Sequence, residues 1–176
     1  MPRAKDLQTV TLELEFPHDW RDPDCHLWFF EHGLPGYSWY VPKANGWLNV
    51  GVGAMAQRLK SRGETIRRHW QHLESTLRRR FDLTLPNRPE GYSYHLRGTT
   101  PARLDDAFLV GDAAGLATRD LCEGIGPAVR SGQRAAAAVL GVRPFELKDV
   151  TGASLGGGFV SRLMDRAFTR GAGKAA

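Results

Sequence analysis

Two short glycine-rich stretches hold the residue types best suited to binding a charged or polyhydroxylated ligand. The letters GDAAG occupy positions 111–115, and EGIG occupies positions 123–126. Small residues let a ligand approach the backbone closely, and an aspartate at a strand end can accept two hydroxyl hydrogen bonds. A helix beginning near Pro127 would direct its partially positive N-terminus toward an anion lying over the second stretch. A plain strand-to-helix turn with a capping aspartate is the structural alternative.

A strand and a helix must position these stretches. The continuous apolar run Ala107–Val110 is typical of a strand that is covered on both faces. Proline suits a first helical turn and Gly141 suits a left-handed stop, so we expect a helix over Pro127–Leu140.

Before these elements, alternating residues predict an antiparallel sheet. Apolar and polar side chains alternate over Val10–Phe16, and Tyr37–Val41, Trp47–Gly53 and Tyr92–Leu96 are also strand-like. Asn45-Gly46 is a strong hairpin signal between two of these strands. Tyr37 and Trp39 are two residues apart and therefore share one face of a strand, as lining a cavity requires. The alternative is that both are ordinary core aromatics of the sheet.

The basic character of the chain is concentrated in one predicted helix. The formal net charge is +5, yet Gln57–Arg80 alone carries eight Lys and Arg against two Glu, a net charge of +6. Apolar residues recur there with helical spacing at Ile66, Trp70, Leu73 and Leu77, which predicts one long helix over about 56–80. No aromatic interleaving accompanies the charges, so we expect a solvated face and no nucleic-acid partner.

The two glycine-rich stretches resemble a known flavin-binding motif. VGDAAG, followed by EGIG, is similar to the second FAD-binding motif of glutathione-reductase-type flavoproteins. The similarity is closer to the para-hydroxybenzoate-hydroxylase-like group and, within it, to the geranylgeranyl reductase family. The segment PGYSWYVPK at 35–43 and the segment LNVGVG at 48–53 also look like that family's Y-x-W-x-F-P segment and its hairpin partner. Val41 departs from this pattern, because the family usually has Phe there.

The resemblance implies roles for particular residues. Asp112 would bind the flavin ribitol, and the turn before the helix would offer backbone N–H groups to the isoalloxazine. Tyr37 and Trp39 would face the substrate cavity, while no catalytic acid or base can be chosen. The implied cofactor is FAD, with NADPH or another reductant as electron donor. The implied cofactor-binding residues are Gly111, Asp112, Ala113, Gly115, Gly124, Ile125 and Gly126.

One expected part of such a flavoprotein has no counterpart in the sequence. The AMP half of FAD is normally bound by a G-x-G-x-x-G turn after an opening strand, and no such pattern occurs here. We therefore expect the C-terminal half of an FAD-dependent enzyme, as a fragment or with a separate chain supplying the N-terminal half. The fold class is mixed α+β and α/β, an antiparallel substrate-domain sheet joined to the last strand and helix of a Rossmann-like FAD domain.

The expected organisation has three parts. Residues 1–99 form the substrate-domain sheet with the basic helix, 100–145 form the FAD-domain segment, and 146–176 form a Gly-rich linker with an amphipathic tail. The tail could contact a membrane surface or pack onto the core. The six histidines show no metal-ligand spacing, and neither a signal peptide nor a long apolar run is present, so a cytoplasmic location is the default.

The implied activity is reduction of alkene bonds in an isoprenoid-like or other hydrophobic substrate by hydride transfer from reduced flavin. Two alternatives from other classes stay open. One is a flavin monooxygenase of the same fold, and the other is a non-enzymatic orphan half or partner-binding subunit.

Overall fold

The computed structural model describes residues 7–96, 102–148, 150, 154, 158–160, 162–163 and 166. The chain divides into two compact units, one formed by Thr9–Ser93 and the other by Met1–Gln8 together with Tyr94–Ala176. Each unit is described on its own. No helix within the described residues is long and apolar enough to cross a membrane.

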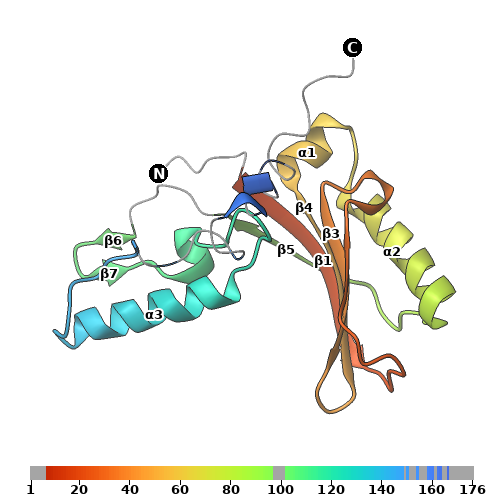
Figure 1. Ribbon diagram of the computed structural model, residues 1–176, viewed down its shortest axis with the longest axis horizontal. Helices are drawn as coiled ribbons and strands as arrows, with labels where there is room; N and C mark the ends of the chain where they lie inside the picture. Colours follow the sequence, from red (N-terminus) through yellow and green to blue (C-terminus); the bar gives the residue numbers. More distant parts are fainter. Residues whose placement is uncertain are drawn as a thin grey trace. The chain divides into compact units, whose positions relative to one another are not determined.

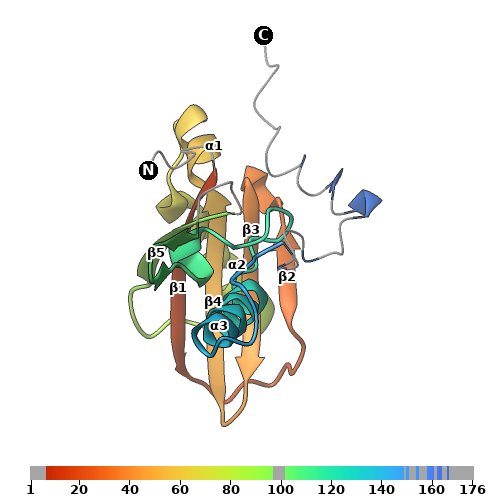
Figure 2. The ribbon, with the colours of Figure 1, turned by 90° about the vertical axis from the view of Figure 1, so that its left-hand side faces the viewer.

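A five-stranded sheet with the strand order β2-β3-β4-β1-β5 dominates the first unit. Figure 2 shows these strands side by side. The neighbouring pairs β1–β4, β2–β3 and β3–β4 are antiparallel. The mixed α/β fold class and the antiparallel sheet predicted from the sequence are therefore confirmed. The strands are β1 (Gln8–Pro17), β2 (His26–Phe29), β3 (Gly36–Lys43), β4 (Trp47–Met55) and β5 (Glu90–His95).

The alternation read from the sequence decides which face of the sheet is buried. Leu14 and Phe16 of β1, Tyr40 of β3 and Val50 of β4 belong to one hydrophobic core. The hairpin between β3 and β4 pairs Lys43 with Trp47. Its turn uses left-handed backbone at Asn45 (φ 61°) and Gly46 (φ 69°), two residue types that tolerate this conformation.

The single long helix predicted over 56–80 is wrong, because the segment forms two helices (Figure 1). These are α1 (Ala56–Ser61) and α2 (Ile66–Phe81). The chain leaves α1 at Gly63, which has a φ of 64° and donates its N–H to the Lys60 carbonyl at 3.1 Å. A left-handed glycine after the last helical turn is a usual helix stop.

The apolar face predicted for the second of these helices is confirmed. Trp70, Leu73 and Leu77 are buried in the same core as the sheet residues, and Ile66 packs against that core. Figure 1 shows α2 lying along the sheet. The arginines occupy the other sides of the helix, as its exposed Arg67, Arg78 and Arg79 illustrate.

The second unit contains a two-stranded sheet, a 3-10 turn and one long helix. Strands β6 (Arg103–Leu104) and β7 (Ala107–Phe108) pair with each other, and η3 (Gly111–Ala114) and α3 (Ile125–Val139) follow. The helix α3 begins two residues before Pro127, and Gly141 has the expected left-handed conformation, with a φ of 69°.

The prediction of a strand buried on both faces over Ala107–Val110 is wrong within the described residues. Of this run, only Ala107 and Phe108 form strand pairs. They pair with β6 after a tight turn that contains Asp105. Ala107 is exposed and Leu109 is 38% exposed. A pair of such short strands offers no second layer to cover the apolar run.

The predicted amphipathic tail falls largely outside the described residues. Among its apolar positions, Phe159, Val160 and Leu163 are exposed. Met164, Ala167 and Phe168 lie outside the described side chains, so the role of the tail stays a prediction.

Candidate functional site

The structure brings together the two glycine-rich stretches that the sequence singled out. Asp112 lies in η3, after the extended Val110, and Gly124 immediately precedes α3. A Cβ atom added to Gly124 would lie 3.0 Å from Oδ1 of Asp112. The Asp112 carboxylate therefore rests directly over the start of α3 while its side chain remains exposed.

Glycine geometry and one buried serine hold the η3 turn against α3. Gly111 and Gly115 have φ values of 54° and 63°, a conformation that favours glycine. A Cβ on Gly111 would meet the Cβ of Ala128 at 3.1 Å, so the turn packs closely on the helix. The Gly111 N–H donates to Oγ of Ser131 at 3.0 Å, and Ser131 is fully buried. Sequence reasoning missed Ser131, since nothing marks an interior helical serine as the partner of a distant turn.

Glu123 fixes the N-terminus of α3. Its backbone carbonyl accepts the Thr118 N–H at 2.8 Å, and its own N–H donates to Oγ1 of Thr118 at 3.1 Å. Its carboxylate Oε1 accepts the Gly126 N–H at 2.7 Å. The Gly126 N–H, which the resemblance would offer to a ligand, is therefore engaged by Glu123 in this structure.

Two further residues hold the loop between η3 and α3. The Asp120 side chain is buried, and its Oδ1 accepts the N–H groups of Leu121 at 3.0 Å and Ser154 at 2.8 Å. Cys122 is buried with a φ of 56°, and its carbonyl accepts the Tyr94 hydroxyl at 3.0 Å. No local pattern could have revealed the contact of Asp120 with Ser154, because the two residues lie 34 positions apart.

The predicted substrate residues Tyr37 and Trp39 share the side of β3 that faces away from the core. Ser38 and Tyr40 alternate with them and are buried, whereas Tyr37 and Trp39 are half-buried. The two ring centroids are 5.8 Å apart, and the Phe29 ring lies 5.2 Å from that of Tyr37. Phe29 extends the aromatic surface, and sequence reasoning did not select it. These aromatics belong to the first unit, whereas Asp112 and Gly124 belong to the second.

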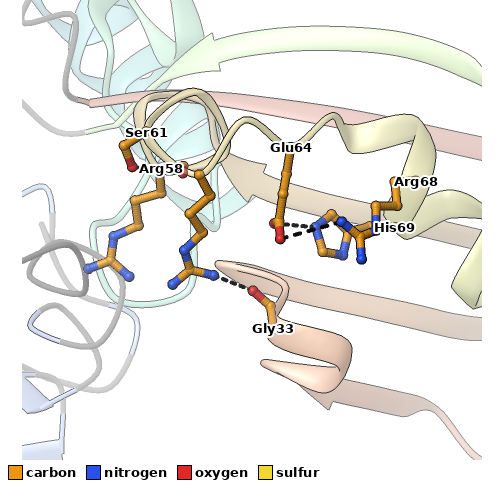
Figure 3. Close-up of polar contacts among 7 residues, drawn as sticks. Gly33, Arg58, Ser61, Glu64, Arg68 and His69 are labelled. Atoms are coloured by element: carbon orange, nitrogen blue, oxygen red, sulfur yellow. Dashed lines mark hydrogen bonds and ion pairs between the residues drawn. The ribbon is translucent and has the colours of Figure 1, made fainter. Parts of the chain in front are cut away.

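A polar cluster joins α1, α2 and the turn after β2 (Figure 3). Oε2 of Glu64 lies 3.0 Å from Nε2 of the buried His69, and the Arg62 guanidinium donates to the Gly33 carbonyl. Burial and the nearby Arg62 charge lower the pKa of Arg58. These contacts fix the start of α2, and no group of three metal-ligating side chains occurs among the described residues.

A cleft of about 720 Å³ lies at the C-terminal end of α2, within the first unit. Tyr40 and Phe81, whose rings stack at 4.4 Å, form part of its wall. Its charged lining is balanced between both signs and therefore favours no ligand charge. The charged lining residues are Arg21, Arg79, Arg80, Asp19, Asp22 and Asp82.

Comparison with solved structures finds a similar fold. The chain resembles a geranylgeranyl bacteriochlorophyll reductase-like protein of Thermoplasma acidophilum, with a TM-score of 0.64 and 20% sequence identity. The likeness covers 95% of this chain and 39% of that protein, so this chain spans well under half of its length. It matches the C-terminal portion of the reductase-like fold. No protein-family model and no curated protein sequence matches the chain.

Proposed function

We propose that this chain forms the flavin-facing and substrate-facing parts of an FAD-dependent oxidoreductase similar to the geranylgeranyl reductases. The observation that carries the proposal is the contact of the Asp112 carboxylate with Gly124 at the start of α3. The reductase-like fold of the solved structure supports the same reading. When bound, FAD would supply hydride transfer to an alkene of an isoprenoid-like or other hydrophobic substrate.

The residues around Asp112 have the chemistry that a flavin requires. An exposed carboxylate can accept hydrogen bonds from neighbouring ribitol hydroxyls. Gly124 has no side chain, and a Cβ there would occupy the space against the carboxylate. The N-terminus of α3 would stabilise negative charge on the flavin ring through its partial positive charge.

The aromatic surface would hold the substrate by apolar contact. Tyr37 and Trp39 present half-buried rings on the face of β3 opposite the core. Such rings bind hydrocarbon through burial of apolar area rather than through hydrogen bonds. The proposed substrate is therefore a hydrophobic small molecule.

Two further components are part of the proposal. The AMP half of FAD needs a binding turn that the sequence lacks, so another polypeptide segment supplies it, within a longer protein or as a separate chain. NADPH or another reductant delivers electrons to the flavin. We propose a cytoplasmic location, with the amphipathic tail available for peripheral membrane contact.

An absorbance titration with FAD tests the proposal. Purified chain is mixed with FAD, and perturbed flavin bands that depend on Asp112 are the expected result. Asp112→Ala should weaken binding about tenfold, as expected for the loss of a hydrogen bond to a charged group. Asp106→Ala, which alters an exposed aspartate in the β6–β7 turn, serves as the matched control. Unperturbed bands at all FAD concentrations would exclude flavin binding by this chain on its own.

Turnover of the flavin-loaded protein then separates the two enzymatic readings. NADPH oxidation that requires an alkene substrate and proceeds without O₂ supports the reductase. Oxidation that requires both O₂ and an aromatic substrate would replace this proposal with the monooxygenase.

A further inference from the structure

The indole ring of Trp39 lies flat across a glycine of the neighbouring strand. Trp39 of β3 is paired with Gly51 of β4. A Cβ on Gly51 would lie only 2.1 Å from Cζ2 and 2.4 Å from Cε2 of the indole. A Cβ on Gly53 would lie 3.5 Å from Cζ3, an ordinary contact. The ring therefore fills the place of the missing Gly51 side chain, and its far edge reaches Gly53.

A chain of hydrogen bonds holds the polar edge of this ring. The Trp39 Nε1–H donates to Oδ1 of Asn49 at 2.6 Å, and Nδ2 of Asn49 donates to Oε2 of Glu15 at 3.2 Å. Nζ of Lys43 donates to the same Glu15 oxygen at 2.7 Å. The hydrogen bond from Lys43 holds the pKa of Glu15 below its usual value. The carboxylate thus remains an acceptor at neutral pH.

Residue 49 must both accept a hydrogen bond from Trp39 and donate one to Glu15 for this series of hydrogen bonds to be complete. An indole N–H can only donate, and an ionised carboxylate can only accept. The amide of Asn49 supplies both functions, and the strand register places Asn49 directly opposite Glu15. An aspartate at position 49 could still accept from the indole but would oppose the Glu15 carboxylate. This asymmetry makes the role of Asn49 testable by a nearly isosteric change.

The indole N–H is consequently already used within the protein. The face of the Trp39 ring is apolar, and the rings of Tyr37 and Phe29 continue from it. Leu27, which pairs with Trp39 across β2 and β3, is 47% exposed. The faces of these rings therefore offer apolar area, with the polar groups of Asn49, Glu15 and Lys43 gathered at the Nε1 edge of the indole.

We propose that Asn49 and Glu15 are positioning residues that lock Trp39 across Gly51, so that Phe29, Tyr37 and Trp39 form a fixed platform for an elongated hydrocarbon chain. The hydrogen bonds that join Trp39, Asn49 and Glu15 are seen in the structure and do not depend on the proposed function. Its part in substrate binding rests on the proposed function.

The first test observes the Trp39 indole N–H by NMR in the full chain, with the signal assigned from Trp39→Phe. Asn49→Ala should move this signal upfield, because the hydrogen bond to Oδ1 is lost. Glu15→Gln should leave it nearly unchanged and Glu15→Ala should displace it, because only glutamine keeps an acceptor for Asn49. Since Glu15 is exposed, these two variants remain informative even if Asn49→Ala folds poorly.

The isosteric variant adds a pH readout that a merely structural role would not produce. Asn49→Asp should resemble the natural chain in acid, where one carboxyl of the pair carries a proton and can donate. It should lose the ordered indole signal as the pH rises and both carboxylates ionise. A signal that is insensitive to Asn49→Ala, or independent of pH in Asn49→Asp, would overturn the proposal.

The second test uses geranylgeraniol as the hydrocarbon probe. Asn49→Ala and Glu15→Ala should each weaken its binding about fivefold, whereas Glu15→Gln restores it. Displaced indole signals with unchanged geranylgeraniol affinity would refute the positioning role. If the natural chain binds no geranylgeraniol, the hydrocarbon platform is refuted, whereas FAD binding at Asp112 is judged separately by the absorbance titration.

Discussion

Oδ1 of Asp112 lies only 3.0 Å from the position that a Cβ atom on Gly124 would take, which is a tight contact. The carboxylate and the start of α3 are therefore parts of one surface, although twelve positions separate the two residues. Because the pair lies within one unit, this relationship is independent of how the two units are arranged.

Gly124→Ala should disturb flavin binding more than folding. The backbone of Gly124 has a φ of −113°, which alanine adopts without strain, but the new methyl would crowd the Asp112 carboxylate and shift it by a few tenths of an ångström. We expect FAD affinity to fall about tenfold and the free energy of unfolding to change by less than about 1 kcal/mol. FAD titration and urea denaturation measure the two effects.

A matched change within α3 serves as its control. Gly132 has nothing within 4 Å of its Cβ position, so Gly132→Ala should raise the free energy of unfolding by about 0.5–1 kcal/mol. FAD affinity should stay the same. Equal FAD affinities in the two alanine variants would remove the special role of Gly124.

Glu123→Ala should destabilise the second unit. The carboxylate caps the Gly126 N–H at 2.7 Å and adds a negative charge at the N-terminus of α3. We expect a loss of about 1 kcal/mol in the free energy of unfolding, measured by urea denaturation. Glu123→Gln keeps an acceptor and should lose less. Identical losses for the two variants would show that the hydrogen bond contributes nothing.

Replacing each of the two glycines of β4, Gly51 and Gly53, by alanine should change the stability of the protein by very different amounts. Gly51→Ala places a methyl 2.1 Å from the Trp39 ring, whereas Gly53→Ala makes contacts no closer than 3.4 Å. We expect a destabilisation of about 1–3 kcal/mol for Gly51→Ala and much less for Gly53→Ala. Thermal melting of the two variants measures the difference. Equal melting temperatures for the two variants would contradict the position of the indole.

Stability should fall in mild acid because of His72. Its ring stacks on that of His32 with centroids 4.7 Å apart. Burial, followed by the charges of His32, His69 and Arg68, lowers the pKa of His72 from 6.5, and Glu64 opposes the shift. The unfolded chain therefore takes up the proton first as the pH falls below 6.5, so folding weakens progressively toward acid.

Replacement of this histidine provides the check. Urea midpoints are compared between about pH 8 and about pH 5, a range in which histidine titrates. His72→Gln should lose less stability toward acid than the natural chain does. Parallel pH profiles would show that His72 makes no contribution.

Local patterns predicted the elements well. Alternation over Val10–Phe16 gave β1, the Asn45-Gly46 turn gave the hairpin, and the spacing from Trp70 to Leu77 gave the buried face of α2. Each signal depends on neighbours within a few positions. The break at Gly63 was missed because the apolar spacing begins only at Ile66 and does not mark the left-handed glycine before it.

Contacts between distant residues were beyond the reach of these patterns. The Ser131 hydroxyl accepts the Gly111 N–H from a different element. The Asn49 amide likewise links Trp39 and Glu15, which lie on two other strands. Only the folded register brings such partners together. The apolar run Ala107–Val110 predicted a covered strand, but covering layers are a tertiary property and the described residues supply none.

Amide NMR of the 176-residue chain during titration with FAD is the most direct test of the flavin site. The signals of Gly111–Gly115 and of Gly124–Gly126 should shift together as FAD is added. Asp112→Ala should weaken this response about tenfold, while Asp106→Ala leaves it unchanged. FAD-dependent shifts confined to other residues, or a response that Asp112→Ala does not alter, would contradict a flavin site at Asp112 and the start of α3.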